Sequence, residues 1–117
     1  MERLGDPLRC EPGWTAEHLV LAGLARCSLA SLEHSAQKMN VAVSGSASAD
    51  GVVTRRDDDG RYAFVEISCR VDAELDPPLQ GSELEQLVAR AERGCFIGAS
   101  LTARPRYTWV VNGSEMG

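Results

Sequence analysis

The chain of 117 residues is 44% hydrophobic, which is enough for one packed core but not for two, so we expect a single domain over residues 1–117. Its 12 basic and 17 acidic residues give a net charge of -5, and only 5% of its residues are aromatic. These values argue against nucleic acid as a partner, because phosphate binding needs a basic surface and single strands stack on aromatic rings. No leader peptide opens the chain and no apolar stretch reaches the roughly 20 residues of a membrane span, so we expect a soluble cytoplasmic protein.

A long helix is predicted from residue 16 to about residue 38. Thr15 is a suitable N-cap, and the stretch contains no Pro and a single Gly. Residues 19–32 are apolar around most of the helix circumference, with only Arg26 and Ser28 as interruptions. A helix that is apolar on all sides is expected to be buried on all sides. We therefore predict that it is the central element of the fold.

After this helix the apolar period changes from that of a helix to that of a strand. Apolar residues at 63, 65, 67, 69 and 71 alternate with Phe64, Glu66, Ser68 and Arg70. The preceding Asp57-Asp58-Asp59-Gly60 is a turn sequence. We therefore predict two strands, at residues 41–56 and 61–74, paired as an antiparallel hairpin.

A second helix is predicted beyond Asp76-Pro77-Pro78, which ends the second strand. Ser82 and, three residues later, Glu85 form the pattern of a capping box. Apolar residues at helical spacing give this helix one hydrophobic face, and Gly94 is its expected C-terminal stop. A short segment at 95–100 and a last strand at 107–111 complete an α+β protein.

The four cysteines are spread along the chain without a C-x-x-C pair, which disfavours a zinc knuckle and a thioredoxin-like motif. Cys69 shares a strand face with apolar residues and is expected to be a core residue. Cys10 has no patterned neighbour and is assigned no role. His18 and His34 lack metal-ligand spacing with any cysteine. We therefore expect neither a metal nor a cofactor.

Cys27 and Cys95 each leave more than one interpretation open. Cys27 lies in the middle of the apolar helix, where desolvation raises the pKa of a thiol and favours simple packing, unless a nearby cation stabilises the thiolate. The adjacent Arg26 points about 100° away around the helix and is a poor candidate for that cation. Cys95 follows Gly94 and can occupy the first turn of a short helix, where an anion is favoured. It can be a nucleophile, a resolving partner or a buried turn residue.

Two segments resemble the cysteine motifs of the OsmC/Ohr family. Residues 15–27 are similar to the family's first-cysteine helix, including a spacing of 10 residues between Glu17 and Cys27, and residues 91–95 resemble the second-cysteine segment. The order of elements also agrees, so the resemblance covers about residues 12–112. It implies the OsmC-like fold, with a long buried central helix, an antiparallel sheet and an intertwined homodimer.

The resemblance also implies a chemistry, which is thiol-dependent reduction of organic hydroperoxides. The thiolate of Cys27 would attack the peroxide and become a sulfenic acid, which Cys95 would capture as a disulfide, and a dithiol such as a lipoyl group would reduce it. Glu17 lies about 15 Å along the helix from Cys27. It either holds an arginine that reaches the thiol or acts as a first-turn acid at the positive end of the helix.

Two departures from the family pattern favour a second interpretation. Phe96 stands where the family usually has Pro after its second cysteine. The N-terminal strands that carry the family's thiol-pairing arginine are largely absent from this shorter chain, which leaves Arg3 and Arg9 as substitutes. The alternative function is a non-catalytic, stress-associated OsmC-like dimer or a small-molecule-binding module, in which Cys27 has an ordinary thiol pKa.

Overall fold

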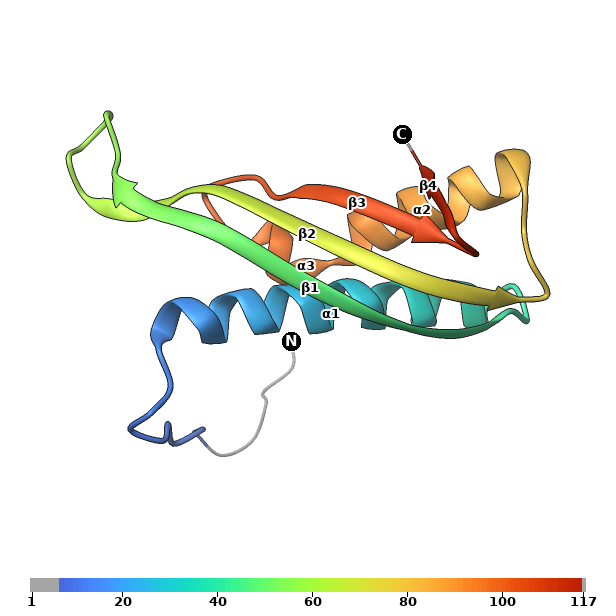
Figure 1. Cartoon of the computed structure of the whole chain (residues 1–117), viewed down its shortest axis with the longest axis horizontal. Helices are drawn as coiled ribbons and strands as arrows, with labels where there is room; N and C mark the ends of the chain where they lie inside the picture. Colours follow the sequence, from blue (N-terminus) through green and yellow to red (C-terminus); the bar gives the residue numbers. More distant parts are fainter. Residues whose placement is uncertain (1–6, 117) are drawn as a thin grey trace.

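The protein is built from a four-stranded sheet with two main helices packed against one of its faces (Figure 1). The computed structural model describes residues 7–116. None of the helices in this range is long and apolar enough to span a membrane. In chain order the elements are α1 (Ala16–Gln37), β1 (Ala42–Arg55), β2 (Tyr62–Asp76), α2 (Gly81–Gly94), α3 (Phe96–Ala99), β3 (Arg106–Val111) and β4 (Ser114–Met116).

The sheet has the strand order β1-β2-β3-β4 and is mixed. β1 and β2 form the long antiparallel hairpin that the sequence predicts, with Ala49 opposite Cys69. β2 and β3 are parallel, with Cys69 beside Tyr107. The expectation of an antiparallel sheet is therefore wrong for this pair. The reason is that α2 and α3 carry the chain back across the sheet, and such a crossover delivers a parallel strand.

Only one face of the hairpin is apolar, and this decides where the helices lie. Alternate β2 residues from Ile67 to Leu75 are buried, whereas the residues between them are mostly exposed and polar. β1 also has one inner and one outer face, because the register pairs outward-facing residues such as Ser48 and Arg70. The alternation expected from the sequence is thus confirmed, except that Val65 is exposed at the distal end of the hairpin.

Helix α1 begins and ends where the sequence predicts, but one chain buries only one side of it. The Thr15 side chain accepts a hydrogen bond from the His18 backbone N–H, as expected of an N-cap. The buried residues of α1 form a single stripe that faces the sheet and α2. Leu19, away from that stripe, is 39% exposed. The prediction that α1 is buried on all sides is therefore not met within one chain. Only one side of α1 is buried, because the other elements contact it from that side alone.

Two local predictions for the C-terminal half need correction. The capping box is wrong, because α2 already begins at Gly81 and Ser82 lies inside the first turn. The N-cap is Gln80, whose side chain makes no cap hydrogen bond. The strand at residues 107–111 is not the last one, because Asn112-Gly113 adopts positive φ angles and turns the chain into β4. The predicted stop at Gly94 is confirmed.

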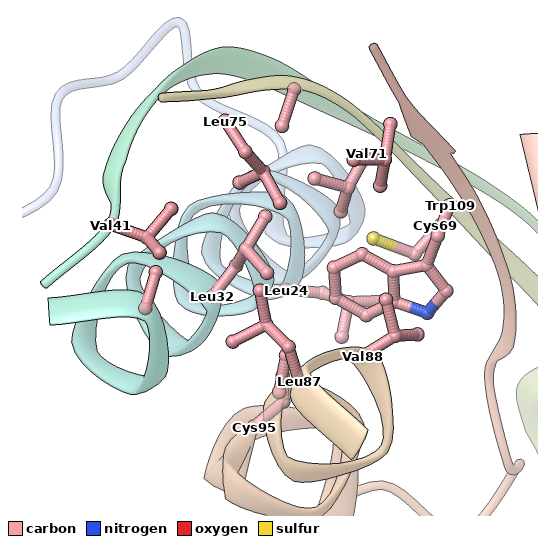
Figure 2. Close-up of a cluster of buried hydrophobic side chains, with 14 of the residues drawn as sticks. Leu24, Leu32, Val41, Cys69, Val71, Leu75, Leu87, Val88, Cys95 and Trp109 are labelled. Atoms are coloured by element: carbon pink, nitrogen blue, oxygen red, sulfur yellow. The ribbon is translucent and has the colours of Figure 1, made fainter. Parts of the chain in front are cut away.

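The hydrophobic core lies between α1, α2 and the inner face of the sheet (Figure 2). The Trp109 indole N–H donates a hydrogen bond of 2.7 Å to the Glu92 carboxylate, which ties β3 to α2. Because α3 follows α2 directly, this packing also fixes the start of α3 against α1. The labelled core side chains in Figure 2 are Leu24, Leu32, Val41, Cys69, Val71, Leu75, Leu87, Val88, Cys95 and Trp109.

Candidate active site

Cys27 lies on α1 at the contact with α3 and is half-buried. Burial raises the pKa of the Cys27 thiol above its ordinary value. The backbone N–H groups of Ile97 and Phe96 oppose this rise, and the neighbouring Cys95 reinforces it. No guanidinium of the described residues contributes to the pKa of Cys27. In one chain, therefore, Cys27 holds its proton more firmly than a free thiol does.

Cys95 connects α2 to α3 and is only 1% exposed. Burial alone would raise the pKa of its thiol, but several hydrogen-bonding groups surround the sulfur and hold the pKa below its ordinary value. They are the Ser28 hydroxyl, the Gly98 backbone N–H, the Tyr107 hydroxyl and the Cys27 thiol. The Ser28 Oγ lies 3.4 Å from the Cys95 sulfur.

Cys27, on α1, and Cys95, at the start of α3, are neighbours in the structure. Each thiol alters the pKa of the other, raising it at Cys27 and lowering it at Cys95. A pair that interacts in this way shares its protons, and the first one to leave comes from Cys95.

Ser28 joins a third cysteine to this pair. Its hydroxyl donates a hydrogen bond of 2.8 Å to the Leu24 carbonyl, and the Cys69 thiol donates one of 3.4 Å to the same hydroxyl. Cys69 is 1% exposed, and burial raises the pKa of its thiol. The expectation that Cys69 is a core residue is thus confirmed.

The charged candidates that the structure describes are all exposed. Glu17 is exposed in the first turn of α1, ten residues before Cys27. Arg26 is exposed and forms an ion pair of 3.4 Å with Glu33, so it points away from Cys27 as predicted. Arg9 is exposed in the segment before α1, and Arg3 lies outside the described residues.

Sequence reasoning missed Ser28 and Tyr107. In the sequence Ser28 is only a polar residue within an apolar helix, and the reactive role was assigned to its neighbour Cys27. Tyr107 was visible only as the start of a strand, because nothing local reveals that the parallel register sets it beside Cys69. No group of metal-binding side chains occurs within residues 7–116.

Comparison with known families gives one match over most of the chain. The family model described as OsmC-like protein matches residues 8–110. No curated protein sequence matches the chain.

Solved structures share the fold at low sequence identity. An OsmC-like protein of unknown function from Vibrio cholerae O1 biovar eltor str. N16961 has a TM-score of 0.71 and 19% identity, covering 81% of this chain and 63% of its own. The organic hydroperoxide resistance protein OhrB of Bacillus subtilis has a TM-score of 0.63 and 20% identity, with 87% and 73% covered. An organic hydroperoxide resistance protein OsmC from Legionella pneumophila has a TM-score of 0.58 and 23% identity, with 86% and 72% covered. This chain therefore spans less than two thirds of the Vibrio protein.

Proposed function

We propose, from the premise that this chain belongs to the OsmC-like protein family, that it is a thiol-dependent peroxidase which reduces organic hydroperoxides through Cys27 and Cys95. Membership of the family, and with it the α+β OsmC-like fold, confirms the resemblance seen in the sequence. The peroxidase activity itself rests on the geometry of the two cysteines.

The observation that supports the proposal is the proximity of the Cys27 and Cys95 thiols, each of which acts on the pKa of the other. A sulfenic acid formed on either sulfur has a thiol within reach to capture it. The hydroperoxide then takes up the two electrons of the dithiol, so that one disulfide, one alcohol and one water are formed. A dithiol of the lipoyl type, in a reducing cytoplasm, would return the pair to its reduced form.

Cys27 is the better candidate for the attack on the peroxide, with Cys95 as the resolving cysteine. Cys27 is half-buried whereas Cys95 is 1% exposed, so a peroxide reaches the Cys27 sulfur first. The higher pKa of Cys27 leaves less thiolate but makes that thiolate intrinsically more nucleophilic. The neighbouring Cys95 sulfur, when it is a thiolate, can accept the Cys27 proton as the S–O bond forms.

We propose that Glu17 acts at the start of α1 and not at the Cys27 sulfur. It is exposed at the start of α1, about 15 Å along the helix from Cys27, and cannot touch the thiol directly. An arginine held by this carboxylate, from a second copy of the chain or from the N-terminal segment, would stabilise the Cys27 thiolate.

A homodimer is part of the proposal, because one chain leaves large apolar side chains uncovered. Val52, Val53, Tyr62 and Val65 are exposed toward the distal end of the β1–β2 hairpin, which extends past the helices (Figure 1). A second copy that covers them would also add to the limited burial of a chain of this size.

The test is a peroxide assay with free-thiol counting. An alkyl hydroperoxide added to the reduced protein should consume two thiols per chain, and a dithiol should then restore them. Replacement of Cys69 by Ser is the matched control, because it removes a buried thiol near the pair but leaves both reactive sulfurs. Thiols that stay intact in the presence of excess hydroperoxide would exclude the activity.

One observation favours the alternative of a non-catalytic family member that acts as a stress-associated dimer or a small-molecule-binding module. The pKa of Cys27 is raised, and no arginine of the described residues acts on it. In this case alkylation of Cys27 stays slow at neutral pH even in the assembled protein, and hydroperoxide consumes no thiols. Fast alkylation below the ordinary thiol pKa of about 8.5 would instead favour the peroxidase.

A further inference from the structure

We propose that Tyr107 and Ser28 position Cys95 as a buried thiolate leaving group, so that the reductant which reopens the Cys27–Cys95 disulfide attacks the Cys27 sulfur. This inference rests on the proposed function, because it concerns the second half of the same redox cycle. It adds two positioning residues and a direction of attack that family membership does not specify.

The first step of the argument is the set of donors around the Cys95 sulfur. The Gly98 backbone N–H comes from α3, the Ser28 hydroxyl from α1 and the Tyr107 hydroxyl from β3. Donors on three separate elements converge on one sulfur that is almost fully shielded from water. Hydrogen bonds to a charged acceptor are stronger than those to a neutral one, most of all in a shielded site. The arrangement therefore favours the thiolate of Cys95.

The two side-chain donors differ in how freely they can give their protons. Ser28 has one hydroxyl proton, which it donates to the Leu24 carbonyl at 2.8 Å. When Cys95 is ionised, this proton can rotate to the sulfur at 3.4 Å, while Cys69 keeps donating to the Ser28 oxygen. Tyr107 makes no comparable bond to a backbone carbonyl among residues 7–116. Both hydroxyls therefore act on the Cys95 sulfur, and Ser28 has the larger effect on its pKa.

Tyr107 is held in place by its packing. Its ring stacks on that of Trp109, with centroids 5.9 Å apart and planes inclined by 19°, and Trp109 is in turn fixed by its bond to Glu92. The hydroxyl lies so close to Gly98 that a Cβ at position 98 would overlap it, and that Cβ would stand 3.6 Å from the Cys95 sulfur. The absence of a side chain at Gly98 is thus what lets the Tyr107 hydroxyl approach Cys95.

Other titratable groups around Cys95 do not supply the stabilisation. Cys27 from α1 and Cys69 from β2 face it as thiols, and both have raised pKa values. Burial and the bond to Cys95 also raise the pKa of the Tyr107 hydroxyl, so it stays a donor. Cys95 helps to line a cleft of about 420 Å³ whose charged lining residues are Glu92, Arg93 and Arg104.

The chemical consequence follows from how thiol–disulfide exchange works. A reductant thiolate forms a bond to one sulfur while the other sulfur leaves with the electron pair of the broken S–S bond. Exchange is faster when the leaving thiol has the lower pKa, and in this pair that thiol is Cys95. The attack therefore occurs at Cys27, which gives a mixed disulfide between Cys27 and the reductant and a thiolate at Cys95. The second thiol of the reductant then releases Cys27 and closes its own disulfide.

Exposure points to the same sulfur. Cys27 is half-buried on the α1 surface beside Phe96, whose side chain is 69% exposed. Cys95 contributes to the wall of the 420 Å³ cleft, but it is only 1% exposed. A thiol bulky enough to belong to a cofactor or a peptide meets Cys27 first.

The first test identifies the sulfur that the reductant attacks. The full chain, with Cys10 replaced by Ser, is oxidised to the Cys27–Cys95 disulfide and exposed briefly to a small monothiol, 2-mercaptoethanol. Acid quenching and peptide mapping then locate the mixed disulfide. The adduct should fall on Cys27 in at least about tenfold excess over Cys95, because Cys27 is the more exposed sulfur and Cys95 the better leaving group. An equal distribution, or an excess on Cys95 reached through the cleft, would overturn the inference.

The second test asks whether Tyr107 and Ser28 cause this preference. Thiolate absorbance is titrated in a chain whose only cysteine is Cys95, with and without Tyr107→Phe. Loss of one hydrogen bond to a charged sulfur should raise the midpoint by about one pH unit, and Ser28→Ala should raise it at least as much. Tyr62→Phe is the matched control, because Tyr62 is 71% exposed on the hairpin. An unchanged midpoint in a folded Tyr107→Phe chain would contradict the positioning role.

The two proposals can fail separately. If hydroperoxide forms no disulfide, the peroxidase is excluded, but the disulfide can still be made with diamide and the monothiol experiment carried out on it. If hydroperoxide does form the disulfide and the monothiol adduct lies on Cys95, the peroxidase stands and the direction of reduction is refuted.

Discussion

Cys27 and Cys95 are neighbours, yet their surroundings shift the pKa values of their thiols in opposite directions. Cys27 lies on a helix surface with two backbone N–H groups nearby, and burial and its neighbour raise its pKa. Cys95 is more deeply buried but has donors on several sides, and its pKa is lowered. The more buried thiol is thus the one that ionises first.

This difference shows that burial alone does not decide which cysteine of a pair is charged. Desolvation is the largest single influence on both thiols. What separates them is the number and direction of hydrogen-bond donors that each sulfur meets, which depends on elements far apart in the sequence. Substitutions that act on only one of the two cysteines can therefore test this difference.

Removal of either sulfur should have the largest effect and should separate their roles. In Cys27→Ser, hydroperoxide turnover should fall by at least about 10³-fold, because the attacking atom is lost. In Cys95→Ser, a single oxidation of Cys27 should survive and stop at the sulfenic acid, which a dimedone-type probe can trap. A sulfenic acid trapped on Cys95 in the Cys27→Ser variant would reverse the assignment.

Gly98→Ala should disturb Cys95 more than Cys27. The new methyl group overlaps the Tyr107 hydroxyl and forces it away from the sulfur. We expect the Cys95 thiolate to appear about one pH unit higher, as for the loss of a single charged hydrogen bond. Alkylation of Cys27 as a function of pH should change less. Equal changes at both sulfurs would mean that the substitution disrupts α3 as a whole.

The free energy of unfolding should depend on pH in opposite ways for the two thiols. The folded pKa of Cys95 lies below its unfolded value of about 8.5, so its stabilisation is complete above that pH and is lost as the pH falls through the folded pKa. Cys27 has a raised pKa, so its contribution has the opposite sign and is lost as the pH rises. Tyr107→Phe should therefore cost the reduced protein about 1 kcal/mol more at about pH 9 than at about pH 5. Urea unfolding at the two pH values measures this difference, and a cost independent of pH would contradict the account.

Arg26→Ala should have the smallest effect. The guanidinium pairs with Glu33 on the exposed side of α1 and does not act on the pKa of Cys27. Alkylation of Cys27 in this variant should differ from that of the unaltered chain by less than about twofold, since exposed ion pairs contribute little. A marked slowing would show that Arg26 reaches the thiol in solution.

Much of the fold could be predicted from local sequence, because local rules govern those parts. The absence of Pro and the N-cap at Thr15 define α1, and alternation with an Asp-rich turn defines the hairpin. The errors concern long-range arrangement. The parallel pairing of β2 with β3 depends on the path of the chain through α2 and α3. The one-sided burial of α1 depends on which elements contact it.

The candidate site, too, could be predicted only in part from the sequence. The two cysteines were identified from their context along the chain, and the structure brings their thiols together. Ser28 and Tyr107 could not be identified, since one is a helix residue and the other a strand residue separated by nearly eighty positions of sequence. Only the packing of α1 and β3 around α3 places both hydroxyls at one sulfur.

The most direct test of the account is peptide mapping of the reduced protein after one equivalent of an alkyl hydroperoxide. The account predicts a single disulfide-linked peptide pair that contains Cys27 and Cys95, with Cys69 recovered as a free thiol. Recovery of Cys27 and Cys95 as unlinked free thiols, or a disulfide that joins other cysteines, would contradict it.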